Sequence, residues 1–155
     1  MLTLLVLMAV IAPARSPPSP GSRVAGAAWG MTPEQVAAAV PGIRAVRWGT
    51  SLSDARKRGV RATEVYGIGV EAEYFYGPDG LAFIRLDAPF GRCGDLVDGL
   101  LAEHGSPTEV SDQAILKLIT WEDPDAGNRL VLLHSSAGIC DLRIRSIAAA
   151  GSGDS

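Results

Sequence analysis

The sequence of 155 residues has few of the residues from which many active sites and membrane spans are built. It contains two cysteines and two histidines, and no apolar run approaches the roughly twenty residues of a membrane-spanning helix. Its net charge of −3 gives no basis for binding nucleic acid or an anionic membrane through bulk electrostatics. A hydrophobic content of 47% excludes a disordered chain, and the length allows one ordinary domain.

Motifs for catalysis and cofactor binding are also missing. The sequence has no G-x-S-x-G nucleophile elbow, and Gly67–Gly69 lacks the third glycine and the following helix of a dinucleotide site. His104 falls in the last turn of an expected helix and His134 at a strand end, and both are interpreted as structural or solvent-facing. We therefore predict no enzymatic activity, no catalytic residue, no cofactor and no metal. The alternative is a small ligand-binding domain or hydrolase that uses His134 or paired carboxylates such as Glu71 and Glu73.

The N-terminal residues have the pattern of an export signal. An uncharged and nearly all-aliphatic run leads to Ala12-Pro13-Ala14, a small-x-small site of the kind that signal peptidases cleave. We expect a signal peptide at 1–14, a flexible leader rich in Pro, Gly and Ser at 15–28, one folded domain at 29–147 and a disordered tail at 148–155. The mature chain is then periplasmic or secreted and has no transmembrane segment.

Export gives the two cysteines a structural meaning. In an oxidising compartment an even number of cysteines favours disulfide pairing, so Cys93 and Cys140 are expected to form a bridge. The alternative is a metal site that adds His104 and His134 to the two thiols. Zinc ligands usually come in closely spaced pairs, and these four residues are dispersed along the chain. The spacing therefore favours the disulfide.

Short periodic segments predict an α+β fold. Thr32-Pro33-Glu34-Gln35 has the residues of a helix N-terminus with a capping box, and a second helix with one apolar stripe is expected at 93–104. The expected strands are at 43–48, 70–76, 81–87, 114–121, 129–134 and 140–146, and a polar loop is expected at 49–59. The order of these elements predicts one antiparallel sheet built from two helix-plus-strands units, with both helices on one face.

The start of the expected domain resembles a known group of proteins. Its motif is Trp29-Gly30-Met31-Thr32-Pro33-Glu34-Gln35-Val36. This motif is similar to the opening shared by small exported bacterial domains of helix-plus-β-hairpin repeats, a fold that includes the β-lactamase inhibitor protein and a small outer-membrane-assembly lipoprotein. The resemblance implies a non-enzymatic, protein-binding role. The motif begins a helix, and it carries no functional residue over to this chain.

A basic segment is the main candidate for a binding surface. Residues 1–61 carry eight basic and two acidic side chains, whereas residues 62–155 carry six and fifteen. Such asymmetry can create an anion-binding face, and a solvated loop balanced by the acidic half gives the same pattern. Trp48 is expected to be exposed beside this segment, while Trp29 and Trp121 are expected in the core. The candidate partner-binding residues are Arg44, Arg47, Trp48, Arg56, Lys57, Arg58 and Arg61.

These features predict an exported, non-enzymatic protein-binding or scaffold domain. Its partner is expected to be another envelope or extracellular protein. The expected contact surfaces are the segment 44–61 and the sheet face that the helices leave uncovered.

Overall fold

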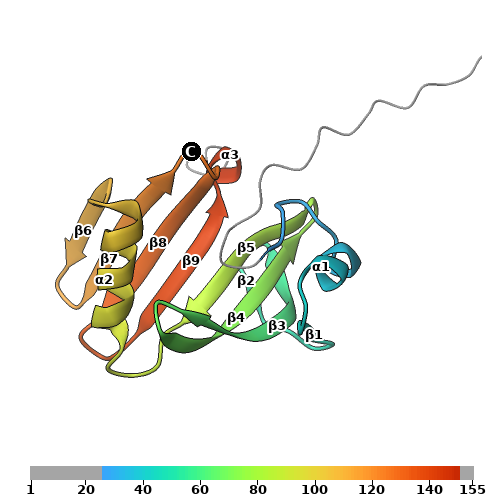
Figure 1. Cartoon of the computed structure of the whole chain (residues 1–155), viewed down its shortest axis with the longest axis horizontal. Coiled ribbons are helices and arrows are strands. Elements are labelled where there is room, and N and C mark those ends of the chain that lie inside the picture. Colours follow the sequence, from blue (N-terminus) through green and yellow to red (C-terminus); the bar gives the residue numbers. More distant parts are fainter. Residues whose placement is uncertain (1–25, 151–155) are drawn as a thin grey trace, which may run out of the picture.

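Strands are the main element of the structure (Figure 1), and their pairing joins them into one sheet. The computed structural model describes residues 26–150, so the predicted signal peptide (1–14), most of the predicted leader (15–28) and the end of the predicted tail (148–155) lie outside the described residues. The strands are β1 (Arg44–Ala45), β2 (Ser51–Leu52), β3 (Ala55–Val65), β4 (Ile68–Gly77), β5 (Gly80–Asp87), β6 (Glu109–Gln113), β7 (Leu116–Asp123), β8 (Asn128–Ser135) and β9 (Cys140–Ser146). The helices are α1 (Pro33–Ala39), α2 (Cys93–His104) and α3 (Ile147–Ala150).

The fold class predicted from the sequence is wrong. Within residues 26–150 the structure is mainly one antiparallel sheet in the order β1-β3-β4-β5-β9-β8-β7-β6, with β2 also paired to β3, and not an assembly of two helix-plus-strands units. The central strands β5 and β9 pair along residues 83–87 and 141–145 and so join all the strands into one sheet. A single apolar cluster spans the sheet and includes both Val36 of α1 and Leu100 of α2. Neither short helix therefore has a core of its own.

Both predicted helices are present. α1 begins after Thr32, whose Oγ1 accepts a hydrogen bond from the Gln35 N–H at 3.3 Å, while the Gln35 side chain accepts one from the Thr32 N–H at 2.8 Å. This capping box satisfies N–H groups that a helix start otherwise leaves unpaired. α2 has the predicted bounds and ends where the Gly105 N–H donates to the Leu101 carbonyl at 2.9 Å. None of the helices in residues 26–150 combines the length and the apolar character of a membrane span.

The sheet contains three strands that the sequence does not predict, and the first, β2, lies inside the expected polar loop at 49–59. β3 begins inside the segment 49–59, where a polar loop is expected, and a β-bulge at Arg58 interrupts the alternation by which a strand is recognised. β6 is an edge strand of mostly exposed residues and has no apolar alternation. The other predicted strands are present within a few residues of their expected bounds, but only Arg44–Ala45 of the segment 43–48 forms a strand. The prediction of a loop is therefore wrong for residues 51–52 and 55–59.

One face of the sheet packs against the helices, and the opposite face carries most of the charged residues of the central strands. Alternate residues of β4 from Ile68 to Tyr76 are buried in the apolar cluster, together with Val36 and Leu100 of the helices. Side chains alternate between faces along a strand, so the intervening Glu71 and Glu73 point to the opposite face. We call the first the core face and the second the open face. Neither α1 nor α2 covers the open face.

The residues before α1 close one end of the core face. Residues 27 and 28, at the end of the predicted leader, are buried. The Gly30 N–H donates to the Leu81 carbonyl at 3.1 Å, which places the chain directly against the β4–β5 turn. Gly80 in this turn has φ +98°, and a Cβ there would lie 2.3 Å from the Gly30 carbonyl oxygen. Only glycine has both the backbone freedom and the small size that this contact requires.

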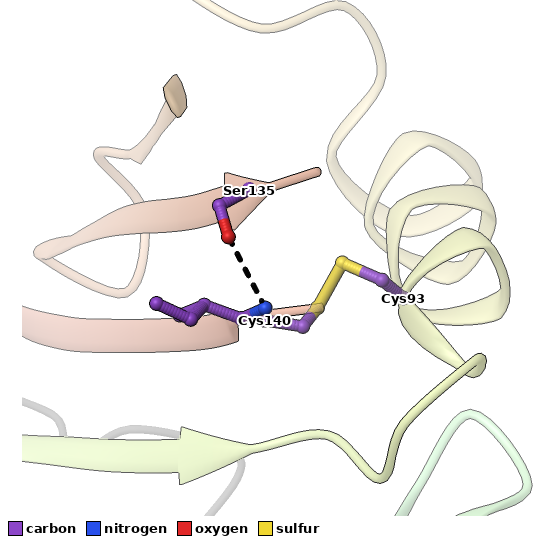
Figure 2. Close-up of a disulfide and its surroundings, with 4 residues drawn as sticks. Cys93, Ser135 and Cys140 are labelled. Carbon is purple, nitrogen blue, oxygen red and sulfur yellow. Dashed lines mark hydrogen bonds between the residues drawn. A yellow bond between two sulfur atoms is a disulfide. The ribbon is translucent and has the colours of Figure 1, made fainter. Parts of the chain in front are cut away.

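The predicted disulfide is confirmed. Cys93, the first residue of α2, and Cys140, the first residue of β9, are bonded, and their Cα atoms lie 5.7 Å apart (Figure 2). The turn before Cys140 is held by a hydrogen bond that the Ile139 N–H donates to Ser135 Oγ at 3.3 Å. The bridge ties α2 to a central strand of the sheet. Both sulfur atoms are engaged in this bond, so neither serves as a thiolate ligand in the alternative metal site.

Removal of the disulfide is expected to destabilise the fold. The bridge spans 47 residues of chain separation, and closing a loop of this length restricts the unfolded chain by about 4 kcal/mol on a chain-entropy estimate. We expect Cys140→Ser, or reduction of the bridge, to lower the free energy of unfolding by about 2–4 kcal/mol in urea titrations followed by tryptophan fluorescence. Reducing agent should leave the midpoint of a Cys93→Ser/Cys140→Ser double variant unchanged. An unchanged midpoint for reduced wild-type protein contradicts this prediction.

Candidate functional site

The segment 46–50 lies along β3 and carries part of the predicted binding surface. The Val46 N–H donates to the Arg58 carbonyl at 2.8 Å, and the Lys57 N–H donates to the Thr50 carbonyl at 3.0 Å. Between these two hydrogen bonds, Gly49 passes so close to β3 that a Cβ there would lie 1.9 Å from the Lys57 carbonyl oxygen. The segment, which we call the Trp48 loop, is therefore fastened to the strand at both ends.

Trp48 is the most exposed large apolar side chain in residues 26–150, with 91% of its surface accessible. The other two tryptophans belong to the core, as predicted. Trp121 is buried and donates from Nε1 to the Gly105 carbonyl at 3.1 Å, and Trp29 packs against the apolar cluster and donates from Nε1 to Asn128 Oδ1 at 2.9 Å. The prediction that Trp48 is the exposed tryptophan is confirmed. A side chain of this size on a fastened loop is positioned for contact with another molecule.

Two arginines of β3 line a groove beside this loop. Arg56 lies opposite Tyr76 of β4, and Arg58 is the additional residue of the β-bulge between Lys57 and Gly59. The groove lies between the start of α1, β1, β3 and the β4–β5 turn, and its volume is about 620 Å³. We call it the arginine groove. Its lining residues are Thr32, Pro33, Glu34, Ala45, Val46, Arg56, Arg58, Tyr76, Gly77, Pro78 and Gly80.

The exposed arginines of this region form no close ion pair with the part of the chain that the structure describes. Arg47, Arg56 and Arg58 are exposed, and none of them forms an ion pair with a carboxylate of residues 26–150. Guanidinium groups form strong, often bidentate hydrogen bonds with carboxylates and other oxyanions. The groove and the loop can therefore bind an acidic group of a partner.

Two other groups of the groove have perturbed acidities. The backbone N–H of Glu34 and the hydroxyl of Thr32 hold the pKa of the Glu34 carboxyl below its ordinary value. Burial raises the pKa of the Tyr76 phenol, and the nearby Tyr74 and Glu34 add to this effect. Glu34 is therefore ionised and Tyr76 is neutral at physiological pH, so the phenol can donate a hydrogen bond to a bound anion.

The seven predicted binding residues do not form one surface. Arg44 lies at the sheet edge, 3.4 Å from Glu71. Lys57 points to the open face, where its Nζ lies 2.6 Å from Glu73 Oε1. Arg61 lies opposite Ala72, whose side chain is on the core face. The residues that the structure brings together at the loop and the groove are Arg47, Trp48, Arg56 and Arg58.

The carboxylate pair of the alternative prediction is held in ion pairs. Glu73 is buried, with Lys57 Nζ at 2.6 Å from one oxygen and Arg85 Nε at 2.8 Å from the other. The Arg85 contact is an ion pair whose atoms are not aligned for a hydrogen bond. Glu71 is exposed and pairs with Arg44. The two carboxylates share the open face, and each is occupied by its own cations.

His134 lies in a second hollow that the sequence analysis does not predict. The hollow has a volume of about 290 Å³ and is bounded by the β5–α2 loop, the disulfide and the β8–β9 turn. Phe90 and Ile139 line it and are 87% and 50% exposed. Ser135 also lines it, and its hydroxyl accepts the hydrogen bond from Ile139. The ligand-binding or hydrolase alternative for His134 stays a prediction.

The walls of the arginine groove are also not predicted by the sequence. Thr32, Tyr76 and Pro78 meet Arg56 only because β3 pairs with β4 and α1 packs beside the β4–β5 turn. The available signal was the alternation in β4, which places Tyr74 and Tyr76 on one face. It does not indicate which strand lies next to that face.

Comparisons with known proteins add a distant structural likeness. No protein-family model matches the sequence, and no curated protein matches it significantly. Among solved structures, a DUF4309 family protein (YjgB) from Bacillus subtilis subsp. subtilis str. 168 is similar, with 13% sequence identity, a TM-score of 0.43, and coverage of 74% of this chain and 78% of that chain. A likeness at this level carries no argument about function. The resemblance to the β-lactamase inhibitor protein and the outer-membrane-assembly lipoprotein receives no specific support from these comparisons.

Gly49→Ala tests whether close contact with β3 holds the Trp48 loop in place. The added Cβ clashes with the Lys57 carbonyl, so we expect faster amide hydrogen exchange at Val46 and Lys57 and a loss of about 1–3 kcal/mol in unfolding free energy. Gly69→Ala in β4 is the matched control, because no atom lies within 4 Å of a Cβ at that position. If the exchange of the Val46 and Lys57 amides is the same in Gly49→Ala and wild type, the loop is not held in this way.

Proposed function

We propose that this protein is an exported, non-enzymatic domain that binds an acidic surface of another protein in the envelope or outside the cell. The contact residues are Trp48, Arg47, Arg56 and Arg58. The observation that carries the proposal is the 91% exposure of Trp48 on a loop beside the arginine groove.

The residue types of this surface favour protein binding. Tryptophan and arginine are the side chains most often found at the energetic centres of protein interfaces. Trp48 contributes little to the folded chain while it is in water, and it can bury a large apolar area against a partner. The two hydrogen bonds that fasten the loop to β3 reduce the conformational entropy that binding would otherwise remove.

The charge of the surface favours an acidic partner. Arg47, Arg56 and Arg58 have no carboxylate partner within residues 26–150, so their charge is available to an incoming molecule. Complementary charge accelerates association and discriminates against basic partners. Because these side chains are exposed, salt screens their interaction, and binding should weaken as ionic strength rises.

The disulfide and the N-terminal sequence support export. A bridge such as Cys93–Cys140 is characteristic of proteins that fold in oxidising compartments. Residues 1–14 have the apolar and small-residue pattern of a secretory signal. The proposed location is therefore the periplasm or the extracellular medium.

The state of the acidic side chains supports binding over hydrolysis. A general acid or base must be free to exchange a proton with a substrate. Glu73 is buried between Lys57 and Arg85, and Glu71 pairs with Arg44. Both carboxylates therefore stabilise the open face through ion pairs, and this role explains their presence there.

Trp48→Ala and an Arg56→Glu/Arg58→Glu double variant are expected to lose partner binding. The partner is first captured by cross-linking from native envelope and medium fractions and identified by mass spectrometry, and its affinity for each variant is then measured by surface plasmon resonance. We expect dissociation constants at least about tenfold higher for both variants, as is typical of interface hot spots. The affinity of the double variant should also depend less on salt.

Phe90→Ala and Arg92→Ala serve as matched controls. Phe90 is an equally exposed aromatic residue at the second hollow, and Arg92 is an exposed arginine that pairs with Asp95. Both variants should bind like wild type, and all variants should keep the wild-type urea midpoint. Wild-type affinity in Trp48→Ala and in the double variant contradicts the proposed function.

A further inference from the structure

The open face carries an apolar patch on β7 and β8. Its residues, which we call the open patch, are Leu116, Leu118, Val131 and Leu133. They alternate with the buried Ile119, Leu130 and Leu132 of the core face, so they point away from α1 and α2. Each residue of the open patch is partly exposed. Apolar surface of this kind indicates a contact with another molecule.

The register of the strands places charged residues on both sides of this patch. Residues directly opposite each other on antiparallel strands point to the same face and form rows across the sheet. The first row, from β7 to β9, is Glu122, Arg129 and Arg145. The second row, from β6 to β9, is Glu109, Thr120, Val131 and Arg143. The third row, again from β6 to β9, is Ser111, Leu118, Leu133 and Asp141.

Apart from Asp141 of β9, the acidic and basic residues of these rows are separated by the line between β7 and β8. Glu109 and Glu122 lie on the β6–β7 side, whereas Arg129 and Arg143 lie on the β8–β9 side. Within one chain, Arg129 approaches Glu109 only to 3.9 Å. The Nε atom of Arg129 is buried without a hydrogen-bond partner among residues 26–150. Arg129 is therefore not fully satisfied within one chain, whereas Arg143 already pairs with Asp141 at 3.2 Å.

We propose that the open patch binds the open patch of a second copy of this chain, with the two sheets face to face. The two-fold axis runs parallel to the strands and between β7 and β8. This operation places β8 over β7 of the partner subunit and β9 over β6 of the partner subunit, and it keeps each row over the same row. The surface then contacts itself, as a two-fold interface requires.

Apolar and charged residues are both matched by this operation. Leu133 lies over Leu118 of the partner subunit, near the centre of the contact. Arg129 lies over Glu122 of the partner subunit, and Arg143 lies over Glu109 of the partner subunit. Every contact occurs twice. Packed sheets are rotated by about 30°, and long arginine and glutamate side chains span the displacement that this causes.

A second two-fold axis is possible in the plane between the sheets, but it does not bring complementary side chains together. An axis perpendicular to the strands reverses the order of the rows. It places Glu122 over Leu116 of the partner subunit and Arg129 over Ser135 of the partner subunit. Burying a carboxylate against a leucine costs desolvation energy that no hydrogen bond offsets. The charge pattern therefore favours the axis parallel to the strands.

The size of the surface predicts a weak and reversible dimer. Four strands about 4.8 Å apart, over about seven residues that each extend about 3.4 Å, present a face of about 19 Å by 24 Å. Such an area lies at the small end of specific protein interfaces. We therefore expect the dimer to form as the protein concentration rises.

Sedimentation velocity from about 1 μM to about 1 mM tests the dimer. The weight-average mass of the wild-type protein should rise from monomer towards dimer across this range. Leu118→Asp and Leu133→Asp should stay monomeric throughout. Val110→Asp is the matched control and should behave like wild type, because Val110 is an exposed apolar residue of β6 that lies opposite Ile119 of the core face.

Charge reversal tests the symmetry of the contact. Arg129→Glu and Glu122→Arg each place like charges across the interface, so each variant alone should dimerise at least about tenfold more weakly than wild type. An equal mixture of the two variants should restore the dimer, because the mixed pair has opposite charges at both contacts. Repulsion within each chain is unchanged by mixing, so this rescue reports the contact between chains. Arg143→Glu mixed with Glu109→Arg provides a second pair if either first variant fails to fold.

Three results would overturn the proposal. They are a wild-type monomer at every concentration, a dimer that survives both leucine substitutions, and charge-reversed mixtures that remain monomeric. The open patch does not include the Trp48 loop, so Trp48→Ala should dimerise like wild type. The dimer and the proposed function can therefore fail independently of each other.

Discussion

The pairing of β5 with β9 is the interaction on which the rest of the structure depends. These strands are distant in the sequence, and their hydrogen bonds join the strands before α2 to the strands after it. Because side chains alternate along each strand, this pairing also decides which residues enter the core. Ile84 and Leu86 meet Ile144 and Leu142 in the apolar cluster, while the residues between them form the charged centre of the open face.

Charge pairing does not select this register. Arg85 lies opposite Arg143 and Asp87 lies opposite Asp141, so like charges face each other across the two strands. The compensating ion pairs run along the strands, at 2.7 Å for Arg85–Asp87 and 3.2 Å for Arg143–Asp141. Burial raises the pKa of the Asp87 carboxyl. The negative charge of Asp141 also raises this pKa, whereas the positive charge of Arg85 lowers it. A slip of two residues would place Arg85 opposite Asp141, so apolar packing, the loops and the disulfide must hold the observed register.

Local signals allowed part of this structure to be predicted from the sequence. The capping box at Thr32 and the apolar stripe of α2 depend on neighbouring residues, and both helices are present. The disulfide was predictable from an even number of cysteines in a chain with the sequence pattern of export. The single sheet was missed because the β5–β9 pairing joins residues that no local pattern connects. The sequence predicts the basic segment as one surface because it indicates a loop there, whereas in the strand β3 Lys57 points away from its neighbour Arg56.

The β-bulge at Arg58 connects the fold to the candidate site. In an unbroken strand, Arg58 would take the core-face position opposite Tyr74, and the bulge gives this position to Gly59 instead. A Cβ at Gly59 would lie 2.8 Å from Ile43 Cδ1, so a larger residue there would have to displace the Ile43 side chain. The additional residue therefore leaves the core, and its guanidinium joins Arg56 at the arginine groove. The β-bulge that makes β3 hard to recognise in the sequence therefore also places Arg58, the second positive charge of the candidate site, at the groove.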